Sequence, residues 1–271
     1  MEHISSRQNP LVKRVRELAR GRAAGDDGVV EVLLDGPHLL EEAWRSNVEI
    51  SLAMVASDAA DGRFADLASR AAAHGARVVT VPPSMLEAVS PVHAPSGIVA
   101  IARVPRAAMP DVLREKPPLL LVLDGVQDPG NVGAIIRAAE GCGATGVIAG
   151  PGCADPFSWK AVRGTMGSIF RLPVITVAEW TSVLQTLRHE QVRLIATVPR
   201  GGTPLTSADL DAPAAILLGG EGAGLSRQAL DAADERLSIE MRGPVESLNV
   251  AVTAALILYE ASRQRSHVAL R

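Results

Sequence analysis

Cysteines and metal-binding patterns are scarce in this 271-residue chain. Its two cysteines, Cys142 and Cys153, cannot build a disulfide framework, which favours a reducing, cytoplasmic compartment. Its six histidines are scattered, and the sequence contains neither an HxxxH nor a CxxC spacing. Because metal sites usually gather such ligands at short spacings, we expect no metal site.

Long apolar runs and a large excess of charge are also absent. No apolar run reaches the roughly 18 residues of a membrane span, and the basic start of the chain has no apolar signal-peptide core. The chain has 47% hydrophobic residues and a net charge of −3, as in a soluble globular protein. We therefore expect no membrane association, and any contact with nucleic acid must come from a local patch.

One basic patch is present, at the start of the chain. Residues 1–22 contain only two acids, Glu2 and Glu17, against six basic residues: Arg7, Lys13, Arg14, Arg16, Arg20 and Arg22. Such a patch is consistent with an RNA contact and equally with the solvated face of an ordinary helix.

A stretch rich in proline and charge, residues 105–117, divides the chain and is typical of a linker. Before it, residues 1–104 alternate between helical and strand-like patterns, which predicts a small α/β domain. The expected helices cover residues 10–20, 37–44, 66–75 and 84–89. The expected strands cover residues 29–34, 49–56, 76–81 and 97–102.

Residues 118–271 also alternate, which predicts a mainly parallel sheet with helices on both faces. The expected strands cover residues 119–124, 145–150, 172–177, 192–198 and 214–220. The expected helices cover residues 128–143, 157–163, 179–190 and 247–264, with a short helix after residue 226.

Three loops in this second part have the composition of ligand-binding loops. They are "DGVQDPGN" (residues 124–131), "GGEGAG" (219–224) and "MRGPVE" (241–246). Ligands of open α/β sheets bind beyond the carboxyl ends of the strands, so we expect the three loops to meet at one site. Dinucleotide binding is disfavoured, because "GNVGAI" lacks the first glycine pair and no P-loop lysine follows the second loop.

Five segments resemble a known family. "DPGNVGAIIRAAEGCGATGVI", "LLGGEGAGLS" and "IEMRGPVESLNVAVTAALILYE" resemble, in this order, the three motifs of the TrmH/SpoU class of SPOUT RNA ribose 2′-O-methyltransferases. "SSRQNPLVKRVREL" and "LLDGPHLLEEA" resemble the L30e-like substrate-binding domain of its rRNA-directed members. One departure is Glu240, which stands where the family usually has proline.

The resemblance implies an α/β fold in two domains. Residues 118–271 would form a SPOUT α/β-knot catalytic domain with a C-terminal trefoil knot, an exception to the rule against threaded loops. Residues 1–104 would form the smaller L30e-like α/β domain. The resemblance also implies S-adenosylmethionine as cofactor and a homodimer with the active site at its interface.

Carried over position by position, the resemblance also implies the site residues. The catalytic residues would be Asn131, Arg137, Glu221, Ser247 and Asn249. The cofactor would bind to Gly219, Glu221, Gly222, Ile239, Met241, Ser247 and Leu248. RNA would contact Arg7, Lys13, Arg14 and Arg137.

Arg137 is the single cation in the apolar pattern of the predicted helix 128–143. It lies about 9 Å along the helix axis from Asn131, at 1.5 Å per residue, and its side chain points back toward the helix start. From there it can hold the phosphate beside the target ribose. An arginine stays charged at neutral pH, which favours positioning over a role as base, and the base role remains the alternative.

The other catalytic candidates have simpler explanations beside the functional ones. Asn131 is expected to cap the helix that follows it, and Ser247 to cap the final helix. Asn249 would then lie in the first turn of that helix, where a poor helix former suits a polar contact. Glu221 could pair with Arg137 or with an arginine of a partner subunit.

We therefore predict an S-adenosylmethionine-dependent RNA 2′-O-ribose methyltransferase that acts on 23S rRNA. The separate N-terminal domain is typical of rRNA-directed members of the family, whereas tRNA-directed members carry short extensions. The alternatives are a tRNA 2′-O-methyltransferase and a non-catalytic RNA-binding protein of the same fold. The presence of all five catalytic residue types argues against the second alternative.

Overall fold

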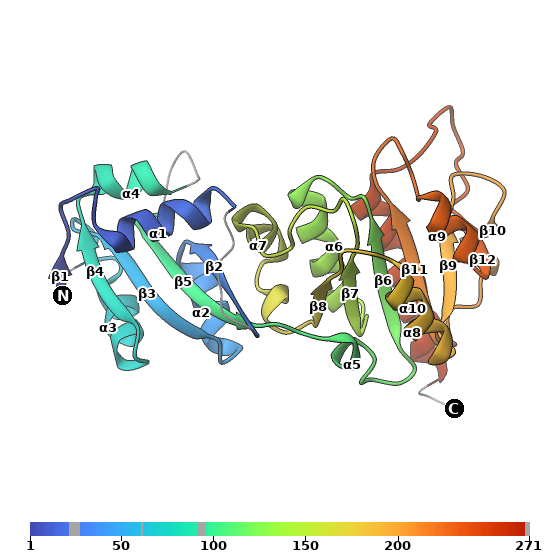
Figure 1. Cartoon of the computed structure of the whole chain (residues 1–271), viewed down its shortest axis with the longest axis horizontal. Helices are drawn as coiled ribbons and strands as arrows, with labels where there is room; N and C mark the ends of the chain where they lie inside the picture. The colour runs from blue at the N-terminus through green and yellow to red at the C-terminus, as the bar shows by residue number, and fades with distance from the viewer. Residues whose placement is uncertain (22–27, 61, 91–95, 269–271) are drawn as a thin grey trace. The chain divides into compact units, whose positions relative to one another are not determined.

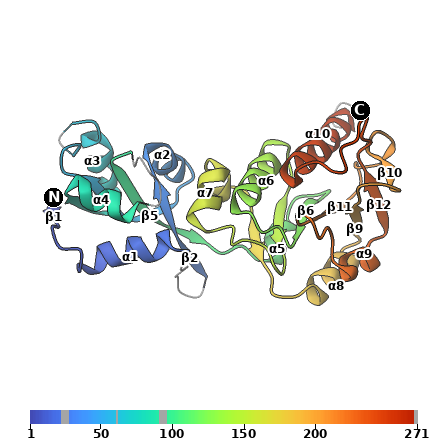
Figure 2. The ribbon, with the colours of Figure 1, turned by 90° about the horizontal axis from the view of Figure 1, so that it is seen from above.

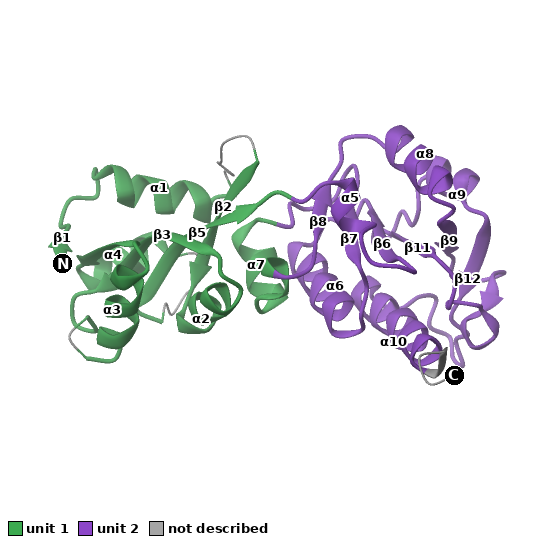
Figure 3. Cartoon of the chain, turned by 90° about the horizontal axis from the view of Figure 1, so that it is seen from below, with its two compact units in different colours: residues 1–106, 157–170 green, residues 107–156, 171–271 purple. Residues whose placement is uncertain are grey.

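The computed structural model describes residues 1–21, 28–60, 62–90 and 96–268 (Figure 1). Arg22, the last member of the expected basic patch, lies outside these residues. The chain forms two compact units (Figure 3): unit 1 comprises residues 1–106 and 157–170, and unit 2 comprises residues 107–156 and 171–271. The domain bounds expected from the sequence stay a prediction.

Unit 1 contains a five-stranded sheet in the order β1-β4-β3-β5-β2. Its first three strands pair in parallel, whereas β5 pairs antiparallel with both β3 and β2. The bounds are β1 (Glu2–His3), β2 (Val29–Asp35), β3 (Glu49–Ala56), β4 (Arg77–Val81) and β5 (Ile98–Pro105). All four strands expected here are present, and the short edge strand β1 is additional.

The helices of unit 1 are α1 (Pro10–Ala19), α2 (Pro37–Arg45), α3 (Ala65–Ala73), α4 (Pro83–Val89) and α7 (Trp159–Thr165), with the 3-10 helix η1 (Ser168–Phe170). The first four match the expected helices. The fifth comes from far along the sequence and packs against β2. Unit 1 is therefore not one continuous stretch of chain.

Helix α1 shows how the sequence directs its own fold. Asn9 precedes Pro10, and its side chain accepts a hydrogen bond from the backbone N–H of Leu11 at 2.9 Å, which caps the helix start. The buried residues of α1 are apolar and recur every three positions, at Val12, Val15 and Leu18. The basic residues of the helix lie outside this apolar face.

Unit 2 contains a seven-stranded sheet in the order β10-β12-β9-β11-β6-β7-β8. Every neighbouring pair is parallel, which confirms the expected parallel sheet. The bounds are β6 (Leu119–Asp124), β7 (Gly146–Ala149), β8 (Val174–Thr176), β9 (Arg193–Thr197), β10 (Thr203–Pro204), β11 (Ala214–Gly219) and β12 (Glu235–Ser238).

Helices cover both faces of this sheet (Figure 2). The bounds are α5 (Met109–Val112), α6 (Pro129–Gly141), α8 (Thr181–His189), the 3-10 helix η2 (Leu205–Ser207), α9 (Arg227–Ala232) and α10 (Val250–Val268). On one face α5, α8 and α9 share a buried apolar cluster with the sheet, and α6 packs with α10 on the other. Strands β6 and β11 are apolar along almost their whole length because both of their faces are covered.

The expected linker, residues 105–117, contains structure of its own. It holds the short helix α5, and Val112 and Leu113 are buried in the core of unit 2. Gly146 of β7 lies directly against this helix, since a Cβ there would come within 2.5 Å of Val112. The segment from Ala107 on therefore packs as part of unit 2.

None of the helices in the described part of the chain is long and apolar enough to cross a membrane. The trefoil knot implied by the family resemblance stays a prediction.

Candidate active site

A cavity of about 720 Å³ opens at the carboxyl edge of the seven-stranded sheet, a volume typical of small-molecule sites. Parallel pairing brings the ends of the central strands to one edge, with Gly219 of β11 level with Asp124 of β6. The cavity is lined by residues of four segments: 197–200, 218–225, 237–250, and 253–257 of α10.

The cavity gathers every residue expected to bind the cofactor. Residues from the loops after β11 and β12 line it together: Gly219, Glu221, Gly222, Ile239, Met241, Ser247 and Leu248. Sequence reasoning missed the segment from Thr197 to Arg200, which also lines the cavity. That segment follows the carboxyl end of β9, so the rule that identified the other loops could have found it.

The glycine loop after β11 is held by contacts inside the protein. A Cβ on Gly219 would lie 2.2 Å from the carbonyl carbon of Gly224, and one on Gly220 would lie 2.0 Å from the carbonyl oxygen of Gly125. Gly222 and Gly224 have positive φ angles of 85° and 69°, which favour glycine. Tight backbone packing, more than the approach of a ligand, therefore explains these glycines.

Three of the five expected catalytic residues bond directly to one another. The Asn131 Nδ2 donates a hydrogen bond to Glu221 Oε1. The Asn249 Nδ2 donates to Asn131 Oδ1 at 3.1 Å and to Glu221 Oε1 at 3.3 Å. We call these three side chains the polar triad. They come from three separate motifs, so the fold joins positions up to 118 residues apart.

The expectation that Asn131 caps its helix is wrong. The cap of α6 is Asp128, whose Oδ1 accepts hydrogen bonds from the backbone N–H groups of Gly130 at 2.6 Å and Asn131 at 3.1 Å. An acid before Pro129 in the first turn is a recognisable helix start. Because Asp128 caps the helix, the side chain of Asn131 is available to the polar triad.

The expected start of the final helix at Ser247 is also wrong. Helix α10 begins at Val250, and Asn249 caps it, because its Oδ1 accepts from the backbone N–H groups of Ala251 at 2.9 Å and Val252 at 3.3 Å. Ser247 is exposed in the loop before the helix and lines the cavity. The Asn249 amide thus caps α10 with its oxygen and joins the polar triad with its nitrogen.

Arg137 lies on the exposed side of α6, away from its apolar face. Val132, Ile135 and Ile136 are fully buried, whereas Arg137 is exposed. Within the described residues, no ion pair or hydrogen bond joins Arg137 to Glu221, so the expected pairing inside one chain is not formed. Glu221 accepts hydrogen bonds from the two asparagines instead.

Some residues of the basic patch form ion pairs within the protein, and others do not. Arg14 is half-buried, and its Nε donates to Glu31 of β2 at 2.8 Å, while its Nη1 lies 3.6 Å from Glu17. Arg7 and Lys13 are exposed, and no ion pair is formed by either within the described part of unit 1. The charge of Arg14 is therefore balanced inside the protein, whereas those of Arg7 and Lys13 face solvent.

Two family models together account for most of the chain. The SpoU rRNA Methylase family model matches residues 118–259, and the MRM3-like substrate binding domain model matches residues 9–100. The chain belongs to the SpoU rRNA methylase family. This confirms the resemblance seen in the sequence motifs.

Relatives and solved structures extend the match to nearly the full length. The chain is 36% identical over 209 residues to the 23S rRNA (guanosine-2′-O-)-methyltransferase RlmB of Burkholderia sp, covering 76% of this chain and 85% of the relative. It is 30% identical to the 23S rRNA (guanosine(2553)-2′-O)-methyltransferase RlmP of Bacillus subtilis, covering 96% and 98%. An AdoMet-bound rRNA methyltransferase from Sinorhizobium meliloti has a TM-score of 0.80 at 27% identity, with 97% of each chain covered.

These matches confirm the fold class, a parallel α/β methyltransferase unit with a separate N-terminal substrate-binding domain. They also confirm the predicted activity, that of an RNA 2′-O-methyltransferase with S-adenosylmethionine as cofactor.

Proposed function

We propose that this enzyme methylates a ribose 2′-hydroxyl of 23S rRNA, with the polar triad and Arg137 as its reactive centre. The observation that carries the proposal is the meeting of Asn131, Glu221 and Asn249 at a cavity lined by all the expected cofactor residues. The relatives RlmB and RlmP, both named as 23S rRNA 2′-O-methyltransferases, support rRNA as substrate over tRNA.

The chemistry of the cavity lining suits S-adenosylmethionine. Apolar side chains such as Leu218, Leu237 and Ile239 provide surface for an adenine ring, and the glycine loop provides backbone polar groups. The bound cofactor supplies a methyl group on a positively charged sulfur. The carboxylates of Glu221 and Glu246 also line the cavity and would favour that charge.

The polar triad would orient the acceptor nucleotide. Its members hold one another through Glu221, so their positions are defined before RNA arrives, and such preorganisation lowers the cost of reaching the transition state. Arg137 is exposed, which leaves its guanidinium available to a phosphate next to the target ribose. In this arrangement the arginine would hold the phosphate and polarise the hydroxyl, whose proton would pass to solvent as its oxygen takes the methyl group from the cofactor sulfur.

We also propose that the enzyme works as a homodimer in the cytoplasm. Helix α10 exposes three large apolar side chains spaced as one helical stripe, Val252, Leu256 and Tyr259. An exposed apolar stripe fits a self-complementary interface between two copies. It starts three residues after Asn249, so a partner docked there would lie beside the polar triad and could bring an arginine to Glu221.

Unit 1 would bind RNA through the unpaired part of the basic patch. Arg7, Lys13 and Arg20 are exposed, and contacts from such residues to phosphates make affinity depend on salt. Replacing Lys13 and Arg20 with glutamine should weaken rRNA binding and flatten its salt dependence. The matched control is Arg45→Gln, because Arg45 already pairs with Glu42 at 2.7 Å.

The activity is tested by transfer of labelled methyl groups from S-adenosylmethionine to purified 23S rRNA, 16S rRNA and tRNA. The expected result is transfer to 23S rRNA at one nucleotide, found by its resistance to alkaline cleavage. A synthetic fragment with 2′-deoxyribose at that nucleotide should accept no methyl group. Faster transfer to tRNA, RNA binding without transfer, or methylation of the deoxy fragment would each contradict the proposal.

A further inference from the structure

Asp124, the last residue of β6, is a buried carboxylate, and each of its oxygens accepts a hydrogen bond. It is 6% exposed. Its Oδ1 accepts a hydrogen bond from Trp180 Nε1 at 3.2 Å, and its Oδ2 accepts one from the backbone N–H of Ser226 at 2.6 Å. Its main-chain oxygen accepts from the backbone N–H of Gly220 at 2.8 Å.

Two of these bonds close the glycine loop at both of its ends. Gly220 is the second residue of that loop, which spans residues 219–224. Ser226 lies two residues after the loop and caps α9. Between them, Glu221 and three further residues line the cavity: Gly222, Gly224 and Leu225. Gly220 also lies against the carbonyl of Gly125, where no side chain would fit. A single residue therefore sets the base of the loop that holds Glu221.

The same residue connects two further parts of the site. Asp124 begins the loop 124–131, which ends at Asn131 of the polar triad. Trp180, its third donor, is buried with its ring against Gly150, where a Cβ would lie 1.9 Å away. The loops after β6 and β11 thus share one buried acceptor, backed by a rigid aromatic ring.

We propose that Asp124 is the positioning residue of the active site, which sets the glycine loop and, through it, Glu221 and the cofactor cavity. The inference rests on the proposed function, because it assigns that cavity to S-adenosylmethionine. Asp124 would touch neither cofactor nor RNA. Its effect would come from holding two backbone N–H groups and one indole N–H at fixed points.

The test replaces Asp124 with asparagine, which has the same shape but only one acceptor oxygen. The amide NH₂ must then face either Trp180 Nε1–H or the Ser226 N–H, and a buried donor facing a donor is unfavourable. We expect Asp124→Asn to bind S-adenosylhomocysteine about tenfold more weakly by calorimetry, as for an unmade buried hydrogen bond. Turnover at saturating cofactor should also fall, because Glu221 moves with the loop.

The second variant is Asp124→Asn combined with Trp180→Phe. The phenylalanine removes one donor, so the amide can turn its NH₂ toward the ring and accept from Ser226. We expect affinity for S-adenosylhomocysteine within about threefold of that of Trp180→Phe alone. If Asp124→Asn acted only by lowering the stability of the protein, the second substitution would not restore the affinity. The control Val122→Ala, in the buried part of β6, should lower the unfolding temperature and leave affinity unchanged.

The outcomes separate the inference from the proposed function. Wild-type protein that bound no S-adenosylhomocysteine would overturn both. Wild-type binding with unchanged affinity and turnover in Asp124→Asn would overturn the inference alone, as would a folded double variant that still bound tenfold more weakly than Trp180→Phe. If the single variant does not fold, recovery of folding and affinity in the double variant supports the inference.

Discussion

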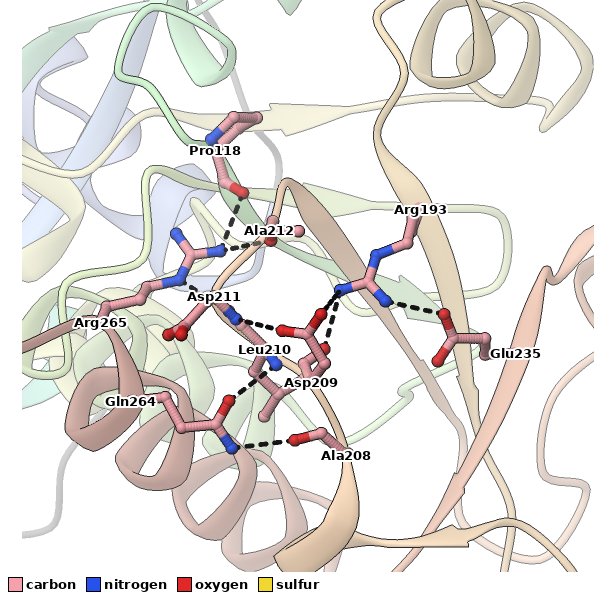
Figure 4. A network of polar contacts seen from close by, with 10 residues as sticks. All are labelled: Pro118, Arg193, Ala208, Asp209, Leu210, Asp211, Ala212, Glu235, Gln264 and Arg265. Carbon is pink, nitrogen blue, oxygen red and sulfur yellow. Dashed lines mark hydrogen bonds and ion pairs between the residues drawn. The ribbon is translucent and has the colours of Figure 1, made fainter. Parts of the chain in front are cut away.

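The two edges of the seven-stranded sheet use similar polar side chains for different purposes. At the carboxyl edge, Asn131, Glu221 and Asn249 bond to one another, and the exposed Glu221 and Asn249 line a cavity. At the amino edge, polar side chains bond mainly to the backbone of the loops that precede the strands (Figure 4). One edge keeps hydrogen-bonding groups open to a ligand, and the other uses them within the chain.

Arg265 bonds to several backbone carbonyl groups at the amino edge. Its guanidinium donates to the carbonyl oxygens of Pro118 at 3.3 Å, Leu210 at 2.9 Å and Ala212 at 2.9 Å (Figure 4). It also donates to the carbonyl oxygen of Pro117 at 2.8 Å. Gln264, its neighbour, accepts from the backbone N–H of Leu210 and donates to the carbonyl of Ala208. Burial lowers the pKa of the Arg265 guanidinium from its usual value, as for a charge enclosed by protein.

Helix α10 connects the two edges. Asn249 caps its start at the polar triad, and Arg265 fastens its far end to the loops before β6 and β11. The same helix therefore has a structural anchor at one end and a residue of the polar triad at the other, about 16 residues or 24 Å apart at 1.5 Å per residue. Changes at one edge should affect catalysis, and changes at the other should affect stability.

The largest expected effect is that of Arg137→Ala. Removal of the exposed cation should slow methyl transfer about a thousandfold, the loss typical of a group that stabilises charge in the transition state. Affinity for S-adenosylmethionine should stay within about threefold, because Arg137 is not among the cavity-lining residues. Single-turnover kinetics and calorimetry measure the two quantities. Loss of cofactor binding would show that Arg137 is misplaced in the proposal.

Asn249→Asp separates the two functions of a single side chain. The carboxylate can still cap α10, so the unfolding temperature should change by less than about 3 °C. Its oxygens cannot donate to Asn131 and would face Glu221 as a like charge, so turnover should fall about a hundredfold. Asn249→Ala, the control, should also lose about 1 kcal/mol of stability with the cap. Equal activity in Asn249→Asp and wild type would contradict the polar triad.

Arg265→Ala tests the amino edge. Loss of charge-assisted bonds to several carbonyls should lower the free energy of unfolding by about 2 kcal/mol and the unfolding temperature by about 4–8 °C. Turnover per folded molecule should stay unchanged. The neighbouring Arg263→Ala is the control, since Arg263 is exposed and pairs only with Glu260 within the described part of α10. A large fall in turnover per folded molecule with an unchanged unfolding temperature would show that the amino edge also serves catalysis, contrary to the proposed difference between the edges.

The smallest effect is expected for the double change Cys142→Ala, Cys153→Ala. Burial raises the pKa of both thiols, so at neutral pH each holds its proton more firmly than a free cysteine and is a poorer nucleophile. The Cys153 Sγ also donates to the carbonyl of Leu123 at 3.2 Å. Methyl transfer should stay within about twofold of wild type, and iodoacetamide should react slowly with either thiol at pH 8. A large loss of activity would indicate a covalent, base-directed mechanism.

Much of the fold was predictable from local patterns. The strands expected at residues 119–124 and 214–220 match β6 and β11, and the helix expected at residues 10–20 matches α1. The glycine loop and its neighbours were correctly expected at one edge of the sheet, because parallel strands end together. Helix starts were less reliable, since Asp128 and Asn131 are both good cap residues and only Asp128, which precedes Pro129, caps the helix.

The sequence by itself determined most of the strands and helices, the family and the residue types of the candidate site, because periodicity and motifs are properties of neighbouring positions. Only the tertiary structure decided which atoms those residues bond. Asn131 meets Glu221 across 90 positions, Asp124 meets Ser226 across 102, and Arg14 is neutralised by Glu31 of another element. A hydrogen bond forms only when donor and acceptor are placed to within a few tenths of an ångström, and for groups far apart in the sequence only chain packing does this.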